Sequence, residues 1–260
     1  MSYETILVEV SEGVATVTLN RPERMNSFNH AMAREFRELW RQVREDPEVR
    51  VIVLRAPPGK AFSTGVDVKE GWRLPGERAQ PFAMDDPGEW LGPKSNKVWK
   101  PMIVCVSGML AGGAFYWLNE ADIVICSEEA TFFDPHVTFG MVAAVEPTGL
   151  MGRINLGQIQ RMALLGNDER ISASTALQIG LVTEVTPLDD LWARGAALAG
   201  LIAAKHPIAI QGTVRAIWEA LGQPRAIAVA NALKYTQLGN PISTAEVSRA
   251  GIKTPPWTLR

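Results

Sequence analysis

Two glycine-containing turns are the first segments of this chain that could do chemistry. Residues 60–67 read KAFSTGVD, and residues 107–114 read SGMLAGGA. Glycine adopts backbone conformations closed to other residues and lets a backbone approach a ligand closely. A turn of this kind can present backbone N–H groups outward, and where it opens a helix these groups are unpaired and carry partial positive charge. Two such groups converging on one oxygen make an oxyanion hole, which lowers a reaction barrier by several kcal/mol.

Each turn alone is weak evidence for such a site. A Gly-Gly pair ahead of a helix, as at Gly112 and Gly113, more often serves close packing than catalysis. The sequence has neither the GxxxxGK[ST] pattern of a phosphate-binding loop nor the GxGxxG pattern of a dinucleotide site. A nucleotide-binding α/β protein is therefore not predicted, and the meaning of the two turns depends on their surroundings.

Three ionisable side chains, Asp134, His136 and Glu146, are candidates for proton transfer. A histidine is suited to this task near neutral pH. Asp134 lies two residues earlier, so on an extended segment both side chains point to one side, where the carboxylate can orient the imidazole and stabilise its cation. Each residue also has a structural interpretation: a histidine bonded to a backbone carbonyl, an aspartate forming a turn before Pro135, and a glutamate at a helix N-terminus.

The hydrophobic pattern predicts the elements that must position these groups. Residues 4–10 alternate in polarity and are followed, after a turn, by a second strand over 14–19, so the chain opens with a hairpin. Apolar residues then recur in steps of three and four over 28–43, which predicts one face of a helix. Ser27 or Asn29 could cap the start of that helix.

Three apolar runs predict strands that are buried on both faces, as in parallel sheets. They occupy residues 49–55, 102–106 and 122–126. Between the last two runs lies the second glycine turn and a possible helix over 114–121. Strand, helix and strand in this order form a βαβ unit.

A long irregular segment over 57–100 separates these strands. It is rich in proline and glycine and carries Trp72, Trp90 and Trp99. Long irregular loops are uncommon in compact domains and are often functional. The tryptophans could line a pocket for a bulky acyl group, and a covering lid or a subunit interface is an equal alternative.

The pattern changes to helices near residue 187. We predict an α/β core over residues 1–195 and a helical region over 196–260, which mediates oligomerisation. The expected amphipathic helices cover 188–204, 208–221 and 226–238.

Composition excludes several classes of function. The chain has 260 residues, 47% of them hydrophobic, with a net charge of -2 and no acidic or basic block, so neither a nucleic-acid nor a membrane partner is expected. Cys105 and Cys126 lie in apolar runs without metal-ligand spacing, so we predict no metal site and no disulfide framework. The sequence shows no signal peptide and no run of about 20 apolar residues, which favours a cytoplasmic protein.

In order and context, the segments resemble the crotonase (enoyl-CoA hydratase/isomerase) superfamily over nearly the whole chain. The resemblance implies a spiral of ββα units with a C-terminal helical region, assembled as trimers or paired trimers. It also implies a CoA thioester substrate and no permanently bound cofactor. The matching segments are NRPERMNSF (20–28), KAFSTGVDVKE (60–70), PMIVCVSGMLAGGAFYWLNEADIVI (101–125), EEATFFDPHVTFGM (128–141) and SASTALQIGLVTEV (172–185).

The same resemblance assigns roles to individual positions. The backbone N–H groups of Thr64 and Gly113 would donate hydrogen bonds to the thioester oxygen and form an oxyanion hole. Other matching positions would lie along the CoA moiety or hold the loop that contacts it. These CoA-binding positions are Arg24, Met25, Ala61, Phe62, Gly65 and Asp67.

The chain departs from the family at two positions. Hydratases carry a glutamate three residues past the oxyanion glycine, where this chain has Tyr116, and a second glutamate where it has His136. Hydration by two glutamates is therefore not expected. We predict enolate chemistry with His136 transferring the proton, assisted by Asp134 or Glu146. Double-bond isomerisation, C–C hydrolysis or decarboxylation fit this change best, and the alternative is a crotonase-fold protein that binds acyl-CoA without turnover.

Overall fold

The computed structural model describes residues 3–72, 86–248 and 257–259. The chain forms two compact units, Met1–Ala203 and Ala204–Arg260. The predicted boundary at residue 195 falls inside helix α7 (Leu188–Ala203), which packs on β3, β5 and β7 of the first unit. The boundary instead follows Ala203, because α7 is one continuous helix whose buried face packs on the sheet of the first unit.

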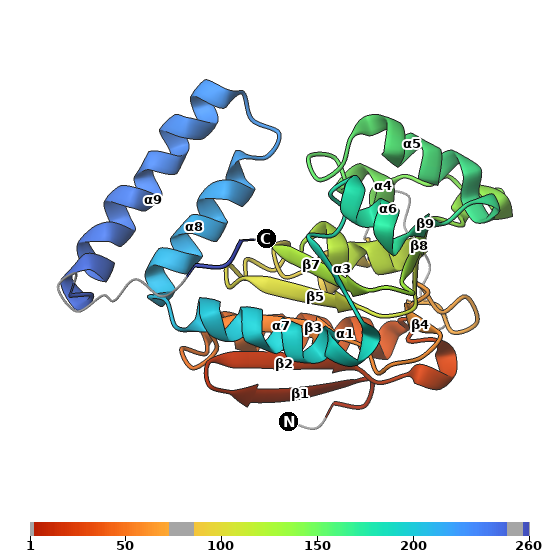
Figure 1. Ribbon diagram of the computed structural model, residues 1–260, viewed down its shortest axis with the longest axis horizontal. Helices are drawn as coiled ribbons and strands as arrows, with labels where there is room; N and C mark the ends of the chain where they lie inside the picture. The colour runs from red at the N-terminus through yellow and green to blue at the C-terminus, as the bar shows by residue number, and fades with distance from the viewer. Residues whose placement is uncertain (1–2, 73–85, 249–256, 260) are drawn as a thin grey trace. The chain divides into compact units, whose positions relative to one another are not determined.

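In the described part of the chain, six strands form the larger sheet in the order β1-β2-β3-β5-β7-β10. Figure 1 labels β1, β2, β3, β5 and β7 of this sheet. The antiparallel pair of β1 and β2 is the predicted hairpin, and the remaining neighbours are parallel. The bounds are β1 Ile6–Ser11, β2 Val14–Leu19, β3 Val51–Arg55, β5 Met102–Val106, β7 Ile123–Ser127 and β10 Glu184–Thr186.

The central strands of this sheet are buried on both faces, as predicted. Successive side chains of a strand point to opposite faces, so Ile52 and Leu54 join the main core while Val51 and Val53 face the other way. The second face is covered by α7, which buries Leu191, Ala199 and Ala203 there, and the main core lies on the opposite side with α1 and α3.

A smaller sheet has the order β4-β6-β8-β9, with β4 (Ala61–Ser63), β6 (Met109–Ala111), β8 (Thr131–Phe133) and β9 (Ile171–Ser172). In two successive repeats, a strand of the larger sheet is followed by a short strand here and then by a helix. These repeats are β5-β6-α3 and β7-β8-α4. They confirm the spiral of ββα units, although the short strands were not predicted individually.

Local signals define the helix that follows the hairpin. Asn29 is the N-cap of α1 (His30–Glu45), because its side chain accepts a hydrogen bond of 3.0 Å from the N–H of Met32. At the other end, Lys100 donates to the carbonyl oxygens of Val43 and Asp46. A buried ammonium therefore satisfies carbonyl groups that the helix leaves unpaired.

Apart from α1 and α7, the helices of the first unit are short. Four 3₁₀ segments accompany them among the described residues: η1 (Pro22–Arg24), η2 (Gly112–Ala114), η3 (His136–Phe139) and η4 (Gly166–Asp168). The α-helices are α2 Gly88–Leu91, α3 Phe115–Asn119, α4 Val145–Gly149, α5 Leu156–Leu165 and α6 Ala173–Gln178.

The second unit contains the two remaining predicted helices, α8 (Pro207–Ala220) and α9 (Arg225–Glu246). Pro207 stands at the first turn of α8, where a missing N–H costs nothing. Helix α9 runs beyond the predicted end at residue 238 and contains Pro241. Within the described residues, no helix is both long and apolar enough to cross a membrane.

Candidate active site

The smaller sheet brings the two glycine turns together. Strand β4 pairs with β6 in parallel, with Ala61 opposite Met109, so the two turns leave the same end of the sheet. Gly65 has a φ of 83°, and a β-carbon added to it would lie 2.6 Å from the backbone nitrogen of Gly113. Only a residue without a side chain permits this approach of two backbones.

Both turns line a pocket of about 770 Å³. Its walls are mainly apolar, and His136 and Arg170 are the ionisable side chains among the lining residues that the structure describes. The wall consists of Met25, Thr64, Val66, Val68, Met109, Ala111, Gly112, Gly113, Phe133, Pro135, His136, Phe139, Met141, Asn167 and Arg170.

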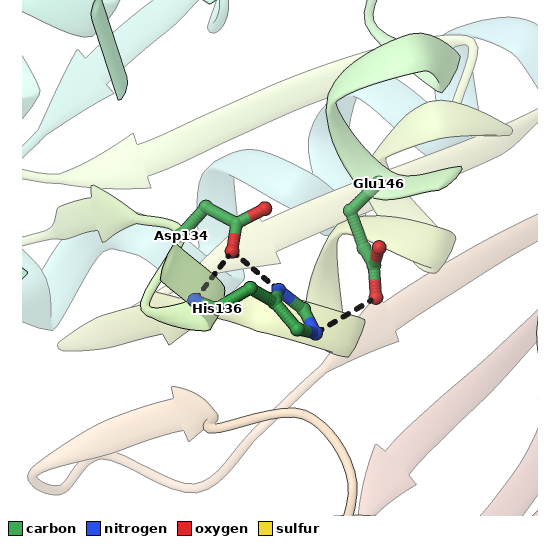
Figure 2. A group of neighbouring side chains, drawn as sticks. All are labelled: Asp134, His136 and Glu146. Carbon is green, nitrogen blue, oxygen red and sulfur yellow. Dashed lines mark hydrogen bonds and ion pairs between the residues drawn. The ribbon is translucent and has the colours of Figure 1, made fainter. Parts of the chain in front are cut away.

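Figure 2 shows Asp134, His136 and Glu146 side by side, with the imidazole between the two carboxyl groups. His136 Nδ1 lies 2.5 Å from Asp134 Oδ1, and the same oxygen accepts the backbone N–H of His136 at 3.1 Å. On the other side of the ring, Nε2 lies 3.7 Å from Glu146 Oε1. Asp134 is fully buried. The ring also borders the second glycine turn, because a β-carbon on Gly112 would lie 3.8 Å from His136 Cε1.

The surroundings of the imidazole favour its protonated form. The hydrogen bond with Asp134 raises the pKa of His136, against an opposing effect of burial, and the charges of Asp134 and Glu146 raise it further. Burial also raises the pKa of Glu146; the charges of Asp134 and Asp86 add to this, while His136 opposes it. The cluster therefore holds protons that isolated side chains would release at lower pH.

Two further polar residues extend the cluster on the side of α3. Tyr116 follows Gly113 by one helical turn, and its hydroxyl donates a hydrogen bond of 2.9 Å to Asp86 Oδ2. Burial raises the pKa of Tyr116, as do the charges of Glu146 and Asp86. A β-carbon on Gly88 would lie 2.5 Å from the Tyr116 ring, so this glycine allows the loop to reach the tyrosine.

Sequence reasoning missed Asp86, although a signal exists. Asp86 and Asp134 each precede a proline, and each accepts the N–H of the residue two positions later, Gly88 at 2.8 Å and His136 at 3.1 Å. In both cases a local turn fixes the carboxyl group, which then reaches a tyrosine hydroxyl or an imidazole. An Asp-Pro pair was the available indication, but it is not specific to a site, because Asp46 at the end of α1 makes the same turn before Pro47 and accepts the N–H of Glu48 at 2.9 Å.

Glu146 is positioned by contacts between α3 and α4. Asn119 donates a hydrogen bond of 3.0 Å from Nδ2 to the carbonyl oxygen of Glu146. A β-carbon on Gly149 would lie 2.1 Å from Asn119 Nδ2, so the glycine makes room for this amide. The two helices thus hold the carboxyl group beside the imidazole.

The positions expected along CoA divide into two groups. Met25 lines the pocket, and Gly65 forms its turn, whereas Arg24 is exposed and lies 3.8 Å from Glu70. Ala61 and Phe62 are buried in β4, and the Phe62 ring packs 6.2 Å from that of Trp117. The Phe62 side chain therefore belongs to the main core, whereas Ala61 is buried outside that cluster.

Asp67 shapes the loop from inside. It pairs with Arg21 at 3.1 Å and accepts the N–H groups of Lys69 and Glu70. Its side chain is buried and does not line the pocket.

Two of the tryptophans that were candidates for an acyl pocket lie elsewhere. Trp72 and Trp90 pack against each other, with ring centroids 6.1 Å apart. His30 contacts both residues, and Arg37 lies over the Trp90 ring. This cluster sits beside α1 and contributes no side chain to the described pocket wall.

The spacing of Asp134, His136 and Glu146 is compatible in distance with a metal site, since suitable atoms lie within 4.8 Å of one another. The directions of the contacts favour a different role. Asp134 binds Nδ1 and Glu146 faces Nε2, so the two carboxyl groups meet opposite edges of one ring. An imidazole contacted by carboxyl groups at both of its nitrogens suits proton transfer.

Comparisons with known proteins agree with this architecture. Residues 9–220 match the family model for enoyl-CoA hydratase/isomerase. The chain is 35% identical over 211 residues to (E)-benzylidenesuccinyl-CoA hydratase of Thauera aromatica, covering 81% of each chain. It is 29% identical over 215 residues to hydroxycinnamoyl-CoA hydratase-lyase of Pseudomonas fluorescens, covering 80% of this chain and 76% of that one.

Among solved structures, an enoyl-CoA hydratase/isomerase from Mycobacterium paratuberculosis is 32% identical and superposes with a TM-score of 0.85 over 100% of both chains. A putative short chain enoyl-CoA hydratase from Novosphingobium aromaticivorans is 26% identical, with a TM-score of 0.81 over 98% of this chain and 99% of that one. The chain therefore belongs to the enoyl-CoA hydratase/isomerase family of the crotonase superfamily, and it is an acyl-CoA enzyme.

Proposed function

We propose that the protein forms an enolate at C2 of an acyl-CoA thioester, with His136 transferring the proton. The observation that carries this proposal is the position of the imidazole. It borders the Gly112–Gly113 turn and the pocket, and a buried aspartate holds its inner nitrogen. A base beside two backbone donors is the arrangement that enolate chemistry requires.

The backbone N–H groups of Thr64 and Gly113 would hold the thioester oxygen. Gly113 lies in the first turn of a 3₁₀ segment, where N–H groups lack an acceptor within the helix. The N–H of Thr64 donates to the carbonyl oxygen of Met25 at 3.3 Å, longer than an ordinary hydrogen bond of about 2.7–3.2 Å. A thioester oxygen that gains negative charge is a stronger acceptor and takes over this donor.

The proton then follows a balanced path. His136 Nε2 removes a proton from C2, and the electron pair of the C–H bond moves into the enolate. The imidazolium is stabilised by Asp134 on one side and Glu146 on the other. Return of the proton to a different carbon completes an isomerisation. In C–C hydrolysis of a 3-oxoacyl thioester, water instead adds to the ketone at C3, the C2–C3 bond breaks to release a carboxylic acid, and the thioester enolate left behind takes a proton at C2.

Arg170 supports the proposed direction of the CoA arm. Its guanidinium lies 4.3 Å from the centroid of the Phe133 ring and contacts Met109 Sδ at 3.0 Å. Met109 begins β6, and the strand ends at Ala111, just before the Gly112–Gly113 turn. Arg170 therefore contacts the end of β6 away from the proposed thioester position, where its guanidinium is suited to the phosphates of CoA.

The test is deuterium exchange in D2O, followed by mass spectrometry of a panel of CoA thioesters. The panel includes short, aromatic and polycyclic 2-enoyl groups and 3-oxo groups. Wild type is expected to incorporate deuterium into at least one thioester, and His136→Gln to abolish incorporation while still binding it. His206→Gln is the matched control, because His206 pairs with the exposed Glu246 within the second unit and does not line the described pocket.

Each outcome has a clear meaning. Exchange that persists in His136→Gln would refute the role of the imidazole. If every thioester bound to wild type but returned unchanged, the alternative of an acyl-CoA-binding protein without turnover would replace this proposal.

We also propose that the chain assembles as a homotrimer or a dimer of trimers through its second unit. Helices α8 and α9 expose many large apolar side chains, which monomers rarely leave in contact with water. Light scattering after size-exclusion chromatography is expected to give three or six times the chain mass, and a monomer would refute this. The exposed side chains are Ile217, Leu221, Ile227, Val229, Leu233, Leu238 and Ile242.

A further inference from the structure

A tyrosine hydroxyl lies between two carboxyl groups beside the proposed site. Tyr116 donates a hydrogen bond of 2.9 Å to Asp86 Oδ2, and the same hydroxyl forms a side-chain hydrogen bond with Glu146. Asp86 belongs to the loop before α2, Tyr116 to α3 and Glu146 to α4. Asn119, one turn after Tyr116 on α3, binds the carbonyl oxygen of Glu146 at 3.0 Å and so helps to fix α4 against α3. Three separate segments therefore meet at one hydroxyl oxygen.

The hydrogen bonds of Asp86 decide which way the hydroxyl proton points. Asp86 Oδ1 accepts the N–H of Gly88 at 2.8 Å, and Oδ2 accepts the Tyr116 hydroxyl, so each carboxyl oxygen has a donor. This arrangement favours the ionised form of a carboxyl group. A tyrosine hydroxyl has a single proton, and once that proton is given to Asp86 the oxygen can only accept. Its contact with Glu146 then requires a proton that belongs to Glu146.

The surroundings of Glu146 favour the same protonated form. Its side chain is buried, and burial raises its pKa; His136 opposes this rise, whereas the charges of Asp134 and Asp86 add to it. The titratable groups that face Glu146 are therefore His136 and Asp134 from the segment around η3, Asp86 from the loop before α2, and Tyr116 from α3. Among them, Tyr116 is the one that can accept a proton from Glu146 without becoming charged.

We propose that Tyr116, fixed by Asp86, is a positioning residue that accepts the proton of Glu146 and keeps this carboxyl group uncharged beside the imidazole. The inference rests on the proposed function, in which His136 removes a proton from C2. A base must be unprotonated to do this. An ionised Glu146, with Oε1 3.7 Å from Nε2, would add its charge to that of Asp134 and hold the ring as an imidazolium before the reaction begins.

An uncharged Glu146 still has a part in the proton transfer. The proton taken from C2 stays on His136 Nε2, and Glu146 Oε1 keeps a lone pair that can accept this new N–H. The proton of Glu146 remains directed toward Tyr116. Asp134 supplies the negative charge that stabilises the imidazolium once it has formed.

The first test is carbon-13 NMR of protein whose glutamates are labelled at the side-chain carboxyl carbon, because that chemical shift reports ionisation. The signal of Glu146 is identified by its absence in Glu146→Gln. In wild type it is expected to titrate above the usual range of glutamate. In Tyr116→Phe the proton of Glu146 loses its acceptor, and in Asp86→Asn the hydroxyl is free to donate to Glu146. Both variants should therefore lower the pH at which this signal titrates.

Tyr3→Phe is the matched control for the loss of a hydroxyl group. Tyr3 donates to Gln42 Oε1 at 3.3 Å and does not line the described pocket. This variant should leave the titration of Glu146 unchanged. Thermal unfolding verifies that every variant is folded.

The pH profile of deuterium exchange separates this role from a merely structural one. In Tyr116→Phe and Asp86→Asn, an ionised Glu146 stabilises the imidazolium and leaves less of the neutral base. Exchange at pH 7 is expected to be about tenfold slower than in wild type, with KM unchanged. The rate should recover as pH rises and the ring loses its proton. A site that was only distorted would stay slow at every pH.

A Glu146 signal that titrates alike in wild type, Tyr116→Phe and Asp86→Asn would overturn the inference, and so would slow exchange that does not recover with pH. The NMR titration needs no substrate, so the two proposals can fail separately. The expected titrations in a wild type that exchanges no thioester would remove the proposed function and leave the proton on Glu146 established. Exchange by His136 with an unchanged Glu146 titration would leave the proposed function standing without this inference.

Discussion

The titration of His136 gives the most direct check of the proposed site, because it needs no substrate. Asp134 Oδ1 accepts from both the ring and the backbone N–H of His136, and Asp134→Asn keeps the shape of the side chain while removing its charge. A hydrogen bond to a charged partner contributes about 1.5–3 kcal/mol. The substitution should therefore lower the pKa of His136 and remove about 1.5–3 kcal/mol of stabilisation of the imidazolium.

The pH dependence of the stability follows from the linkage between proton binding and folding. Asp134 raises the pKa of His136 in the folded protein, so the pair stabilises the fold fully below the unfolded pKa of about 6.5. This stabilisation is lost as pH rises through the higher folded value. Asp134→Asn should therefore reduce the stability most at acidic pH and flatten its dependence on pH above neutrality.

The assay is a pH titration of the histidine Cε1–H signals by NMR. The chain has three histidines, so the signal of His136 can be identified by its absence in His136→Gln. Asp168→Asn, at an exposed position in η4, is the matched control and should shift none of the three. A His136 pKa that is the same in wild type and Asp134→Asn would refute the claim that Asp134 holds the imidazolium.

Three other perturbations test the remaining parts of the site. Gly65→Ala should abolish deuterium exchange and lower the stability by about 1–3 kcal/mol, because its β-carbon would lie 2.6 Å from Gly113 N at a positive φ; a fully active variant would contradict this. Arg170→Gln should weaken binding of a CoA thioester about tenfold and leave the affinity for the matching pantetheine thioester unchanged. An equal loss of affinity for both thioesters would show that Arg170 does not bind the phosphates. Asn119→Ala should cost about 1–3 kcal/mol in urea unfolding, because the carbonyl oxygen of Glu146 loses its donor, and no change in midpoint would argue against that hydrogen bond.

The larger elements could be predicted because their patterns are long and regular. Residues 51–54 are apolar without interruption, and the structure buries them on both faces of a sheet. Apolar residues that recur in steps of three and four over 28–43 predicted α1, whose buried residues include Phe36 and Trp40. Strands β4, β6 and β8 have only three residues each, too few for a period to be recognised.

The composition of the site was predictable only where its contacts are local or the resemblance supplied them. Asp134 and His136 are two residues apart, so their contact follows from the chain itself. The contact of Tyr116 with Asp86 joins segments 30 positions apart and depends on how a loop folds back onto α3. Phe62 was expected along CoA from its place in the segment KAFSTGVD, and its side chain points into the core, where it packs against Trp117.

The contact between Gly65 and Gly113 also bears on how this protein becomes active during folding. The Asp134–His136 pair lies within one short turn, so it can form in a chain that has little other structure. The two backbone donors come from distant segments and meet only when β4 pairs with β6. During refolding, recovery of activity therefore reports the closure of a long-range contact and should lag behind the formation of helices and turns.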